Sequence, residues 1–478
     1  MTEAFHGVTE PRGIDFVAES RLHKGRFGRM FPNVPVFPAD EAELRRLGDT
    51  MEDAEGGSDN PTIPAGYTYL GQFIDHDITF DPVSSLDRFH DPNSLENFRT
   101  PRLDLDSLYG SGLQASPYLY DREANPPVRL LTGKAVDDAG NAVADDDLPR
   151  NSQGVALVGD PRNDENTFVS QLHLLFIKFH NAIVDHVVST GMFSTPDDIF
   201  KEANRLVRWH YQWIVAHDFL RRIAGDDIVD AILTPAASKP TNRRFFGWSE
   251  SPFMPVEFSV AAYRFGHSQV RPRYSLNTLV QNLPIFPPGP NPGRLDAFHG
   301  FRPLPPRWAA SWPFFFELDA EGPQPSRVID TKLAAGLFTL PGTTGEDAPK
   351  LARRNLLRGH KLNLPSGEAV AAAMNEPPLT ADELGLEDFN FPNGTPLWYY
   401  ILGEAERRGD GGSRLGPIGA TIVAEVLLGL IDGDPLSYLS VQPLWTPELP
   451  AAQDGTFTMA DLVRFASPQD AERHGGRA

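Results

Sequence analysis

The stretch GQFIDHD, residues 71–77, places one histidine between two aspartates, with a glutamine four residues before the histidine. In a helical turn, Gln72 and His76 share one face, while Asp75 and Asp77 lie about 100° to either side of the histidine. An imidazole titrates near neutral pH, so His76 could transfer protons, with Gln72 beside it to hold a small polar ligand. Taken alone, the segment fits a hydrogen-bonded structural histidine better than a catalytic one.

A second histidine stands in AAYRFGHSQV, residues 261–270. His267 follows Gly266 on an otherwise apolar segment that predicts a helix, and Arg264 precedes it by one turn. A glycine inside a helix costs about 1 kcal/mol of helix propensity, which is understandable if a flat group must approach the backbone closely. A haem is such a group. By itself, His267 fits a satisfied core histidine equally well.

Two further segments complete an ordered series: GDPRNDEN at residues 159–166 and RNLLRG at residues 354–359. Together with the two histidine segments, they resemble the distal and proximal signatures of the animal-type haem peroxidase family, to which the cyclooxygenases are more distantly related. Four ordered motifs over about 290 residues form a specific signal, although each motif alone is weak. The resemblance implies a haem cofactor.

The proximal side of such a haem is expected around His267. The resemblance implies that His267 is the axial ligand of the haem iron, and neutral imidazole is the usual proximal donor in peroxidases. Asn355 would accept the other ring N–H of His267, and Arg358 would pair with a haem propionate. Without the resemblance, Asn355 is an ordinary helix-surface amide and Arg358 is one more basic residue in ARRNLLRGHK.

The distal side is expected around His76. His76 would take a proton from bound peroxide and deliver it to the departing oxygen, while Arg162 would stabilise the developing charge. Arg162 directly precedes an expected helix start, so its charge could point into a pocket. Gln72 would help to hold a water or a halide.

Covalent attachment of the haem is also implied by the resemblance. Asp75 and Glu165 match the two carboxylates that form ester bonds to haem methyl groups in this family. Asn166 stands where one family member adds a methionine sulfonium bond, so that third link is not expected. Asp75 could instead be a solvated acid, and Glu165 is favoured in a first helical turn by the helix dipole alone.

The segment TPRLDLDSLYG, residues 100–110, suggests a calcium site. Thr100, Arg102, Asp104 and Asp106 alternate, and with Asp77 they offer three carboxylates plus hydroxyl and carbonyl oxygens, a set that suits Ca²⁺. The segment resembles the calcium loop of the family, with Asp106 where serine is usual and Arg102 contributing only its backbone oxygen. Alternating acids on a solvated edge are the alternative. A bound calcium would pin the turn that aims His76.

The elements that must position these residues are mainly helical. Residues 167–188 and 198–225 repeat apolar side chains at spacings of three and four, as long helices with one buried face do. Further helices are expected at residues 256–269, 327–338, 366–375, 396–408 and 417–431. The proline-dense residues 270–325 predict a long loop laid over the core. We therefore predict a mainly α, animal haem peroxidase-like helical fold with long ordered loops.

The motifs lie on both sides of that loop, which favours one large domain. We predict an irregular N-terminal wrapping arm at residues 1–60, a catalytic domain at residues 61–467 and a flexible tail at residues 468–478.

Composition excludes several classes of protein. Lys and Arg number 43 against 64 Asp and Glu, a net charge of −21 that argues against a nucleic-acid partner. No apolar run reaches about 18 residues, so a transmembrane segment is not expected. The absence of cysteine excludes disulfides, thiolate metal sites and cysteine nucleophiles. The first residues lack the pattern of a secretory signal, which makes the cytoplasm the default location, with export by another route open.

The resemblance implies a peroxidase that reduces hydrogen peroxide to water through a ferryl haem and oxidises halide, thiocyanate or a phenolic or other organic donor. Two alternatives stay open. A fatty-acid dioxygenase of the cyclooxygenase branch is disfavoured because Arg264 occupies the position of its radical tyrosine, and Tyr263 is one register off. A non-catalytic haem-binding or adhesion relative is the other, and the oligomeric state is left open.

Overall fold

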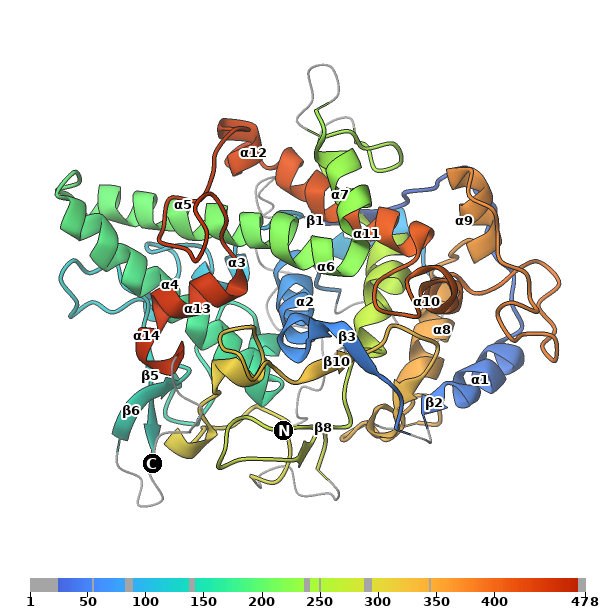
Figure 1. The fold of residues 1–478 in the computed structure, drawn as a ribbon, viewed down its shortest axis with the longest axis horizontal. Helices are drawn as coiled ribbons and strands as arrows, with labels where there is room; N and C mark the ends of the chain where they lie inside the picture. Colours follow the sequence, from blue (N-terminus) through green and yellow to red (C-terminus); the bar gives the residue numbers. More distant parts are fainter. Residues whose placement is uncertain are drawn as a thin grey trace.

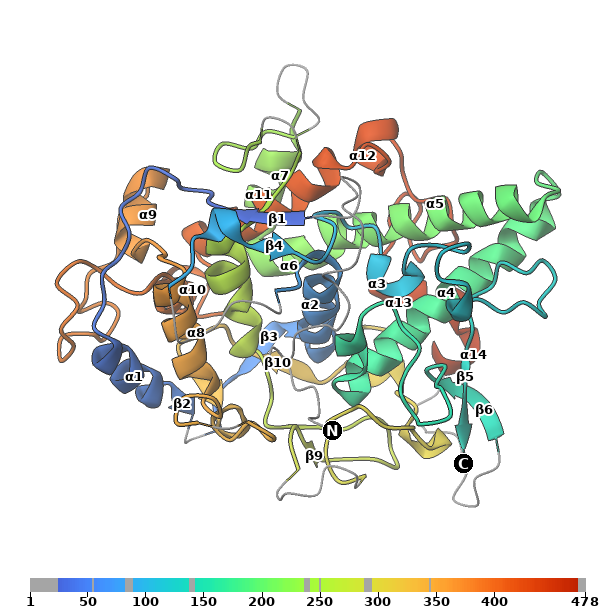
Figure 2. The ribbon, with the colours of Figure 1, turned by 180° about the vertical axis from the view of Figure 1, so that it is seen from behind.

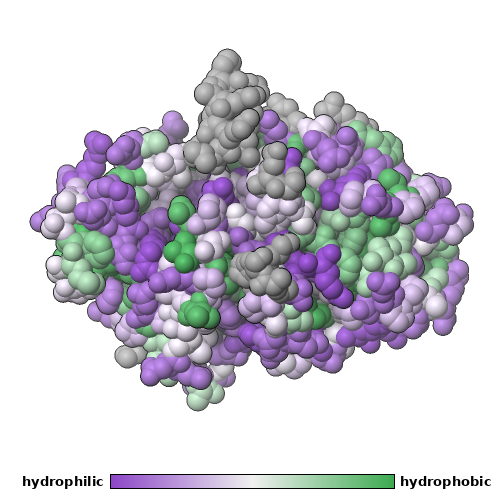
Figure 3. All heavy atoms as spheres, turned by 90° about the horizontal axis from the view of Figure 1, so that it is seen from above, coloured by the Kyte–Doolittle hydropathy of each residue, from purple (hydrophilic) through white to green (hydrophobic). Residues whose placement is uncertain are grey.

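The computed structural model describes residues 25–53, 56–81, 89–136, 142–235, 241–248, 251–287, 295–343 and 345–471. Helices dominate, and the strands are short (Figures 1 and 2). The predicted mainly α fold is confirmed. From above, hydrophilic and hydrophobic side chains alternate over the surface in view (Figure 3).

The longer α-helices make up most of the ordered framework. They are α1 (Glu41–Thr50), α2 (Ala65–Ile78), α4 (Thr167–Thr190), α5 (Pro196–Ile214), α7 (Asp226–Leu233), α8 (Leu351–Lys361), α9 (Gly367–Met374), α10 (Leu397–Arg408), α11 (Pro417–Gly433) and α13 (Met459–Ala466). The shorter ones are α3 (Asp106–Tyr109), α6 (Leu220–Ala224), α12 (Tyr438–Val441) and α14 (Pro468–Ala471).

The strands pair in small sets that tie distant loops together. They are β1 (Gly25–Gly28), β2 (Glu52–Asp53), β3 (Asp59–Pro64), β4 (Glu96–Asn97), β5 (Gly133–Val136), β6 (Ala142–Asp147), β7 (Met254–Pro255), β8 (Arg273–Tyr274), β9 (Leu283–Pro284), β10 (Pro325–Arg327) and β11 (Leu333–Ala334). Strand β1 lies between β4 and β7, and the pairs are β10 with β3, β11 with β2, β5 with β6 and β8 with β9.

The long helix α4 begins at the predicted residue. The side chain of Asn166 caps its first turn by accepting from the Val169 N–H, and Gly191 ends it in the left-handed conformation at φ +66°. Phe168 and Phe176 are fully buried on the face that the apolar spacing predicts. Helix α5 follows after a short turn and packs against α4 (Figure 1).

The predicted helix at residues 198–225 is confirmed, with a local change of pitch. Helix α5 runs into a π-helical turn at Val215–Phe219 and then into α6, which stops at Gly225 with φ +88°. The predicted helices at 366–375, 396–408 and 417–431 correspond to α9, α10 and α11. Helix α11 is buried on nearly every side, as its apolar composition requires.

Two predicted helices take other forms. Residues 256–269 form a π-helical turn, Glu257–Ala261, followed by a 3₁₀ segment, Ala262–His267, in place of one α-helix. The prediction of a helix at residues 327–338 is wrong. There the backbone of β10 pairs with β3 and that of β11 with β2, so the apolar side chains are buried from extended segments and a final 3₁₀ turn.

The predicted N-terminal arm contains regular structure within its described part. Helix α1 is capped by the Asp40 side chain, and Leu44 and Leu47 are buried. It packs against α8 (Figure 2). Residues 1–24 of the predicted arm and residues 472–478 of the predicted tail lie outside the described residues.

Helix α2 occupies the centre of the molecule, between the α4 and α5 pair and the group formed by α8 and α10 (Figures 1 and 2). Residues 270–325 are mostly loop, as their prolines predict, with short strands and 3₁₀ turns among their described residues. Among the described residues, no helix combines the length and apolar character that a membrane span requires.

Candidate functional site

The predicted turn GQFIDHD forms the C-terminal half of α2, directly after β3. His76 is fully buried, and it lines a cavity together with Gln72, one turn earlier on the same face. Asp75 lines the same cavity, whereas Asp77 faces the loop before α3. The turn therefore serves two sites on two faces, as its spacing predicts.

The cavity has a volume of about 760 Å³, within the range of about 300–1,000 Å³ typical of small-molecule and cofactor sites. Glu165 and Asn166 line it from the start of α4. His267 lines it from the 3₁₀ segment. The structure thus brings together the two histidines, which lie about 190 residues apart in the sequence.

His267, the predicted proximal histidine, is contacted by a residue of α8. Nδ2 of the Asn355 side chain lies 2.8 Å from Nδ1 of His267. An amide nitrogen only donates, so this orientation differs from the expectation that Asn355 accepts the ring N–H, which requires the amide to be turned by 180°. In both orientations Nδ1 faces Asn355, so Nε2 is the nitrogen that would ligate a metal. Gly266 lines the cavity, and a Cβ atom placed on it would have no atom within 4 Å. A flat group beside this backbone is therefore compatible with the space that the structure provides.

Arginines lie on the proximal side as well. Arg264 and Arg354 line the cavity. Arg358 donates to the Asp81 carboxylate at 2.7 Å, and burial lowers its pKa while the Asp81 charge acts in the opposite direction. Arg264 and Arg354 are thus better placed than Arg358 to meet an anionic group in the cavity.

The distal histidine is oriented by a residue that the sequence analysis did not single out. Asn163 Oδ1 lies 2.9 Å from Nδ1 of His76, and Asn163 Nδ2 lies 2.9 Å from Nδ1 of His173. Burial lowers the pKa of His173 to about 3, so this ring is neutral and its Nδ1 can accept. The Asn163 oxygen then faces His76 and can accept the Nδ1 proton of that ring, while Nε2 of His76 faces Oε1 of Glu165 at 3.4 Å.

The carboxylates named by the sequence both reach the cavity. Glu165 Oε1 lies 3.4 Å from Nε2 of His76 and accepts from the Gln72 amide. Asn166 donates to Oε1 of Gln72 at 3.1 Å. The Asp75 carboxylate accepts from the Thr79 hydroxyl at 2.8 Å.

Arg162 lies beside the cavity and not in it, contrary to the expectation that its charge points into a pocket. Its guanidinium donates to the buried Asp160 carboxylate and to the backbone oxygens of His76 and Thr79, the last at 2.6 Å. Burial acts to raise the pKa of Asp160, but Arg162 and Arg99 hold it well below its usual range. The buried Asp160 carboxylate attracts the Arg162 guanidinium, which therefore lies against the C-terminal end of α2.

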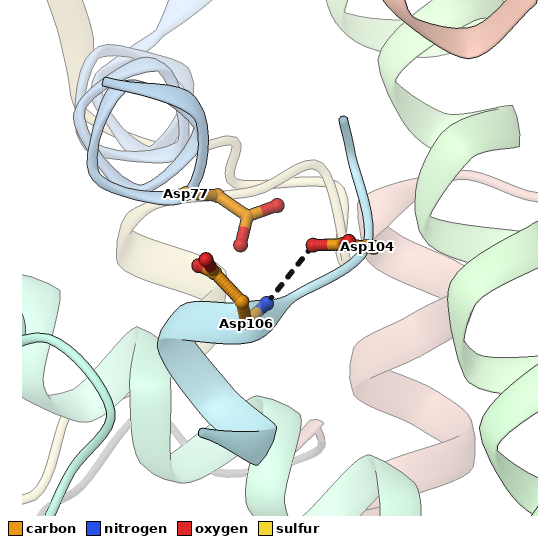
Figure 4. Close-up of side chains that lie close together, drawn as sticks. All are labelled: Asp77, Asp104 and Asp106. Carbon is orange, nitrogen blue, oxygen red and sulfur yellow. Dashed lines mark hydrogen bonds between the residues drawn. The ribbon is translucent and has the colours of Figure 1, made fainter. Parts of the chain in front are cut away.

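The predicted calcium ligands converge on the other face of α2. The carboxylates of Asp77, Asp104 and Asp106 point toward one another (Figure 4), with ligand oxygens within 4.8 Å. The hydroxyl of Thr100 donates to Asp104 at 3.0 Å. Arg102 lies in the same loop, between Thr100 and Asp104. This donor set contains oxygen alone and fits Ca²⁺.

The electrostatics of this acidic cluster favour a bound cation. Burial raises the pKa of Asp77 well above its usual range, and the charges of Asp106 and Asp104 add to the effect. Burial and the Asp106 charge raise the pKa of Asp104 to about 7. Arg99 contacts Asp106 at 3.2 Å and also binds Asp160, so it offsets part of the charge and connects the cluster to Arg162.

Tyr263 also lines the cavity, although its register predicts that it faces elsewhere. Its ring stacks on Phe258 in the π-helical turn, with centroids 4.6 Å apart. The sequence contains no local signal for Tyr263, Asn163, His173 or Arg99, because their contacts join segments far apart in the chain.

Comparisons with known proteins find similarity to haem peroxidases. Residues 86–287 match the family model described as animal haem peroxidase. A peroxidase-like protein of Margaritifera margaritifera is 29% identical over 43% of this chain and 31% of its own length. Human thyroid peroxidase is 24% identical over 60% of this chain and 31% of its own length. The chain therefore spans about a third of the length of these curated relatives.

Solved structures share the fold over nearly the whole chain. Peroxidase A from Dictyostelium discoideum superposes with a TM-score of 0.62 at 16% identity, covering 94% of this chain and 93% of its own. The fatty acid alpha-dioxygenase of Oryza sativa superposes with a TM-score of 0.61 at 15% identity, covering 93% of this chain and 84% of its own.

Proposed function

This chain belongs to the animal haem peroxidase family, and we propose that it reduces hydrogen peroxide to water while oxidising a halide, thiocyanate or phenolic donor. One observation carries the proposal. His76 and His267 line one cavity, and an asparagine amide lies against Nδ1 of each ring, at 2.9 Å and 2.8 Å. Nε2 of His267 would hold an iron, and Nε2 of His76 would exchange a proton.

The residues present fit a haem. His267 would hold the iron, and Asn355 would orient its ring. Arg264 and Arg354 would meet the propionates, in place of Arg358, which is paired with Asp81. Haem, when bound, supplies the oxidation and reduction chemistry of the site.

The distal residues handle protons. His76 Nε2 would take a proton from peroxide bound in the cavity and return it to the departing oxygen. Gln72 would help to hold the peroxide or a halide. Arg162 donates to the His76 carbonyl at 3.2 Å, so we assign it to positioning the end of α2 and not to direct contact with peroxide.

The test is to purify the chain with haem supplied and to measure peroxide-dependent oxidation of guaiacol and of iodide. His267→Ala is expected to lose haem, whereas His76→Ala keeps haem and slows turnover by about 10²–10⁴-fold. His186→Gln is the matched control. His186 lies near the C-terminal end of α4, away from the cavity, and its ring packs against Phe465 of α13. A chain that never takes up haem, or unchanged turnover of His76→Ala, refutes the proposal.

We also propose ester links from Asp75 and Glu165 to haem. Both carboxylates line the cavity. After peroxide treatment, haem should stay with the chain during acid–organic extraction, and Asp75→Asn and Glu165→Gln should each release more of it. Complete extraction from the unaltered chain would remove the ester links and leave the peroxidase proposal in place.

A second candidate function is fatty-acid dioxygenation, which the position of Tyr263 in the cavity wall favours. Haem-loaded protein would then form lipid hydroperoxide from an unsaturated fatty acid and oxygen, and Tyr263→Phe would stop this reaction. If Tyr263→Phe still oxidises guaiacol with peroxide, and no lipid hydroperoxide forms in the unaltered chain, the peroxidase function is supported over the dioxygenase.

A further inference from the structure

Tyr67 lines the cavity from the first turn of α2, and its hydroxyl donates to both oxygens of the Asp218 carboxylate, at 2.9 Å and 2.8 Å. Burial and the Asp218 charge raise the pKa of Tyr67 well above its usual range, so the phenol keeps its proton. A phenol that loses one electron becomes a strong acid, and Asp218 is in position to receive that proton.

The other cavity tyrosines among the described residues lack such an acceptor. The Tyr263 hydroxyl has no hydrogen-bond partner there, and the Tyr69 hydroxyl is hydrogen-bonded to that of Tyr274, a second phenol. An oxidised phenol that keeps its proton is a cation, which burial makes unfavourable. Of the three, Tyr67 is therefore the side chain best placed for one-electron oxidation.

The surroundings of Asp218 tolerate its protonation. The carboxylate also accepts from the Arg222 guanidinium and from the Met459 N–H, each at 2.9 Å. Arg222 donates to the Glu317 carboxylate as well, at 3.2 Å. When Asp218 is neutral, Arg222 therefore keeps a charged partner.

The π-helical turn Val215–Phe219 connects Asp218 with the surface. The ring of the neighbouring His217 stacks on Trp213, with centroids 3.9 Å apart. Trp213 and His217 are both half-buried. One hydrogen bond, one pair of adjacent residues and one ring stack thus connect Tyr67 in the cavity wall with a tryptophan that reaches solvent.

The surface beside Trp213 is apolar. Trp445 packs against Trp213, with centroids 5.8 Å apart. Three apolar side chains in and around α12, at the outer edge of the molecule (Figure 1), are exposed by 55%, 51% and 96%: Leu436, Val441 and Leu444. Grouped apolar side chains on a surface mark interaction sites. We call Trp213 and these three residues the Trp213 patch.

The ion pairs beside the Trp213 patch turn their carboxylates to solvent. Glu448 accepts from Nε1 of Trp445 at 2.6 Å, and its side chain is 49% exposed against 28% for its arginine partner. The charge of Asp230 acts on His217, and its side chain is 62% exposed against 30% for its own arginine partner. With a net charge of −21 on the whole chain, this surface favours a basic partner.

We propose that Trp213 is a second oxidation site, where a basic electron-donor protein too large for the cavity delivers single electrons that reach the haem site through Tyr67. Tyr67 gives one electron to the haem site and its phenolic proton to Asp218. Trp213 returns an electron to Tyr67, which takes back the proton, and the donor protein then reduces Trp213.

For each peroxide, two donor molecules lose one electron each, and two protons from solvent complete two molecules of water. This inference rests on the proposed peroxidase function and adds a class of donor that the cavity cannot admit.

Reduced cytochrome c is the probe, because it is a basic protein that donates one electron and cannot enter a cavity of about 760 Å³. Its peroxide-dependent oxidation by the haem-loaded full chain is measured beside that of guaiacol. Trp213→Phe and Tyr67→Phe should each lower the ratio of cytochrome c oxidation to guaiacol oxidation by about tenfold or more. The rate with cytochrome c should also fall as salt is added.

Trp248→Phe and Tyr120→Phe are the matched controls and should keep the ratio. Trp248 is also half-buried, but it packs on Phe246, with centroids 5.2 Å apart. The Tyr120 hydroxyl is also buried, but it donates to the backbone carbonyl of Tyr109, at 3.3 Å.

A spin trap gives a readout that does not depend on turnover. After peroxide treatment without a donor, 2-methyl-2-nitrosopropane should attach to Trp213, as found by peptide mass spectrometry. Tyr67→Phe should lose this adduct and keep the haem absorbance. A residue with only a structural role would not move the adduct.

No adduct on Trp213, an adduct that persists in Tyr67→Phe, or a ratio that is unaffected by Trp213→Phe overturns the inference, while guaiacol oxidation keeps the peroxidase proposal intact. A cytochrome c rate that does not respond to salt overturns the assignment of a basic partner. Absence of peroxide turnover with guaiacol as well is the separate failure of the proposed function.

Discussion

The amide of Asn163 connects two buried histidines. In the structure its oxygen lies toward His76 and its nitrogen toward His173, whose neutral ring can accept at Nδ1. Asn163, which is not among the residues that line the cavity, is therefore the hydrogen-bond partner of Nδ1 of His76. With Nδ1 bound to Asn163, the proton transfer that we propose for His76 takes place at Nε2.

Replacement of Asn163 tests this link. Asn163→Leu removes both hydrogen bonds at similar side-chain size, so His76 can adopt the other tautomer or rotate. We expect the rate constant for reaction with peroxide to fall by about tenfold and its pH profile to shift, with haem occupancy unchanged. Stopped-flow absorbance of the haem-loaded protein measures the rate.

Asn181→Leu is the matched control. Asn181 lies on α4, whereas Asn163 lies in the 3₁₀ turn Pro161–Asp164 before that helix. The Asn181 side chain bonds to the backbone of Leu130. An unchanged peroxide rate in Asn163→Leu, or an equal loss in Asn181→Leu, contradicts the positioning role.

At the scale of elements, the loop before α3 and the C-terminal half of α2 form one unit. Asp77 accepts from the Leu105 N–H at 3.1 Å, and Leu105 adopts φ +59° so that Asp104 and Asp106 face Asp77. Without a cation, the three closely spaced carboxylates, of which Asp77 is buried and the other two are half-buried, repel one another. A bound Ca²⁺ would remove this repulsion and hold α2 against the loop.

Removal of calcium should therefore disturb the position of His76. We expect chelation to lower the Tm by several degrees and to slow the reaction with peroxide, and added Ca²⁺ to restore both. Asp104→Asn should weaken the response to Ca²⁺, whereas Asp382→Asn, at an exposed position, should not. Metal analysis of the purified protein and thermal scans check this. A Tm that does not respond to chelation in calcium-loaded protein contradicts the site.

The junction of α10 and α11 makes stability depend on pH. The Glu404 carboxylate is fully buried and accepts from the N–H groups of Ile418 and Gly419, at 2.9 Å and 3.2 Å. Burial raises the pKa of Glu404 from 4.5 to about 7. Over that range the folded protein keeps the proton and the unfolded chain releases it, so stability falls as the pH rises from about 4.5 to 7.

Glu404→Gln should remove this contribution. At pH 5 the variant resembles the protonated acid, and its stability should match that of the unaltered chain. At pH 8 it should be more stable, by on the order of 2 kcal/mol, because no buried charge forms. Urea unfolding at the two pH values measures the difference. A variant that is less stable at pH 8 would contradict this prediction. It would show that the hydrogen bonds accepted by the charged carboxylate stabilise the junction by more than burial of its charge destabilises it.

The accuracy of the sequence predictions differs between elements for physical reasons. Helix α4 is predictable because Asn166 caps it and its apolar stripe is wide. Residues 327–338 have apolar spacing but lie in extended pairs, a tertiary preference that local periodicity does not reveal. The π and 3₁₀ turns at residues 257–267 likewise follow from packing around the cavity.

At the scale of the whole molecule, the cavity is a meeting point of distant segments. Motif order predicts that His76, Glu165 and His267 reach one site, and the structure brings them to one cavity. The orientation of Arg162 could not be predicted, because it depends on Asp160 and on Arg99, which is shared with the calcium loop. Side-chain direction is decided by such contacts between segments and not by local sequence.

Because the cavity joins these segments, haem should stabilise the molecule as a whole. Its walls come from α2, the start of α4, the 3₁₀ segment at His267, the loop at residues 298–302 and the segment from 337 to 354. A ligand that binds only the folded cavity adds stability according to its concentration over its Kd, about 4 kcal/mol at a thousandfold excess. We expect haem to raise the Tm and to slow hydrogen exchange in all these segments together.

Hydrogen-exchange mass spectrometry with and without haem measures this coupling. Residues near Met192, which is 75% exposed between α4 and α5, serve as an internal control and should not change. His267→Ala should lose the protection in every segment at once, since the iron contact would be gone. Protection confined to residues 262–270 would show that haem binds one segment without joining the others, and would contradict a cavity that is completed by the cofactor.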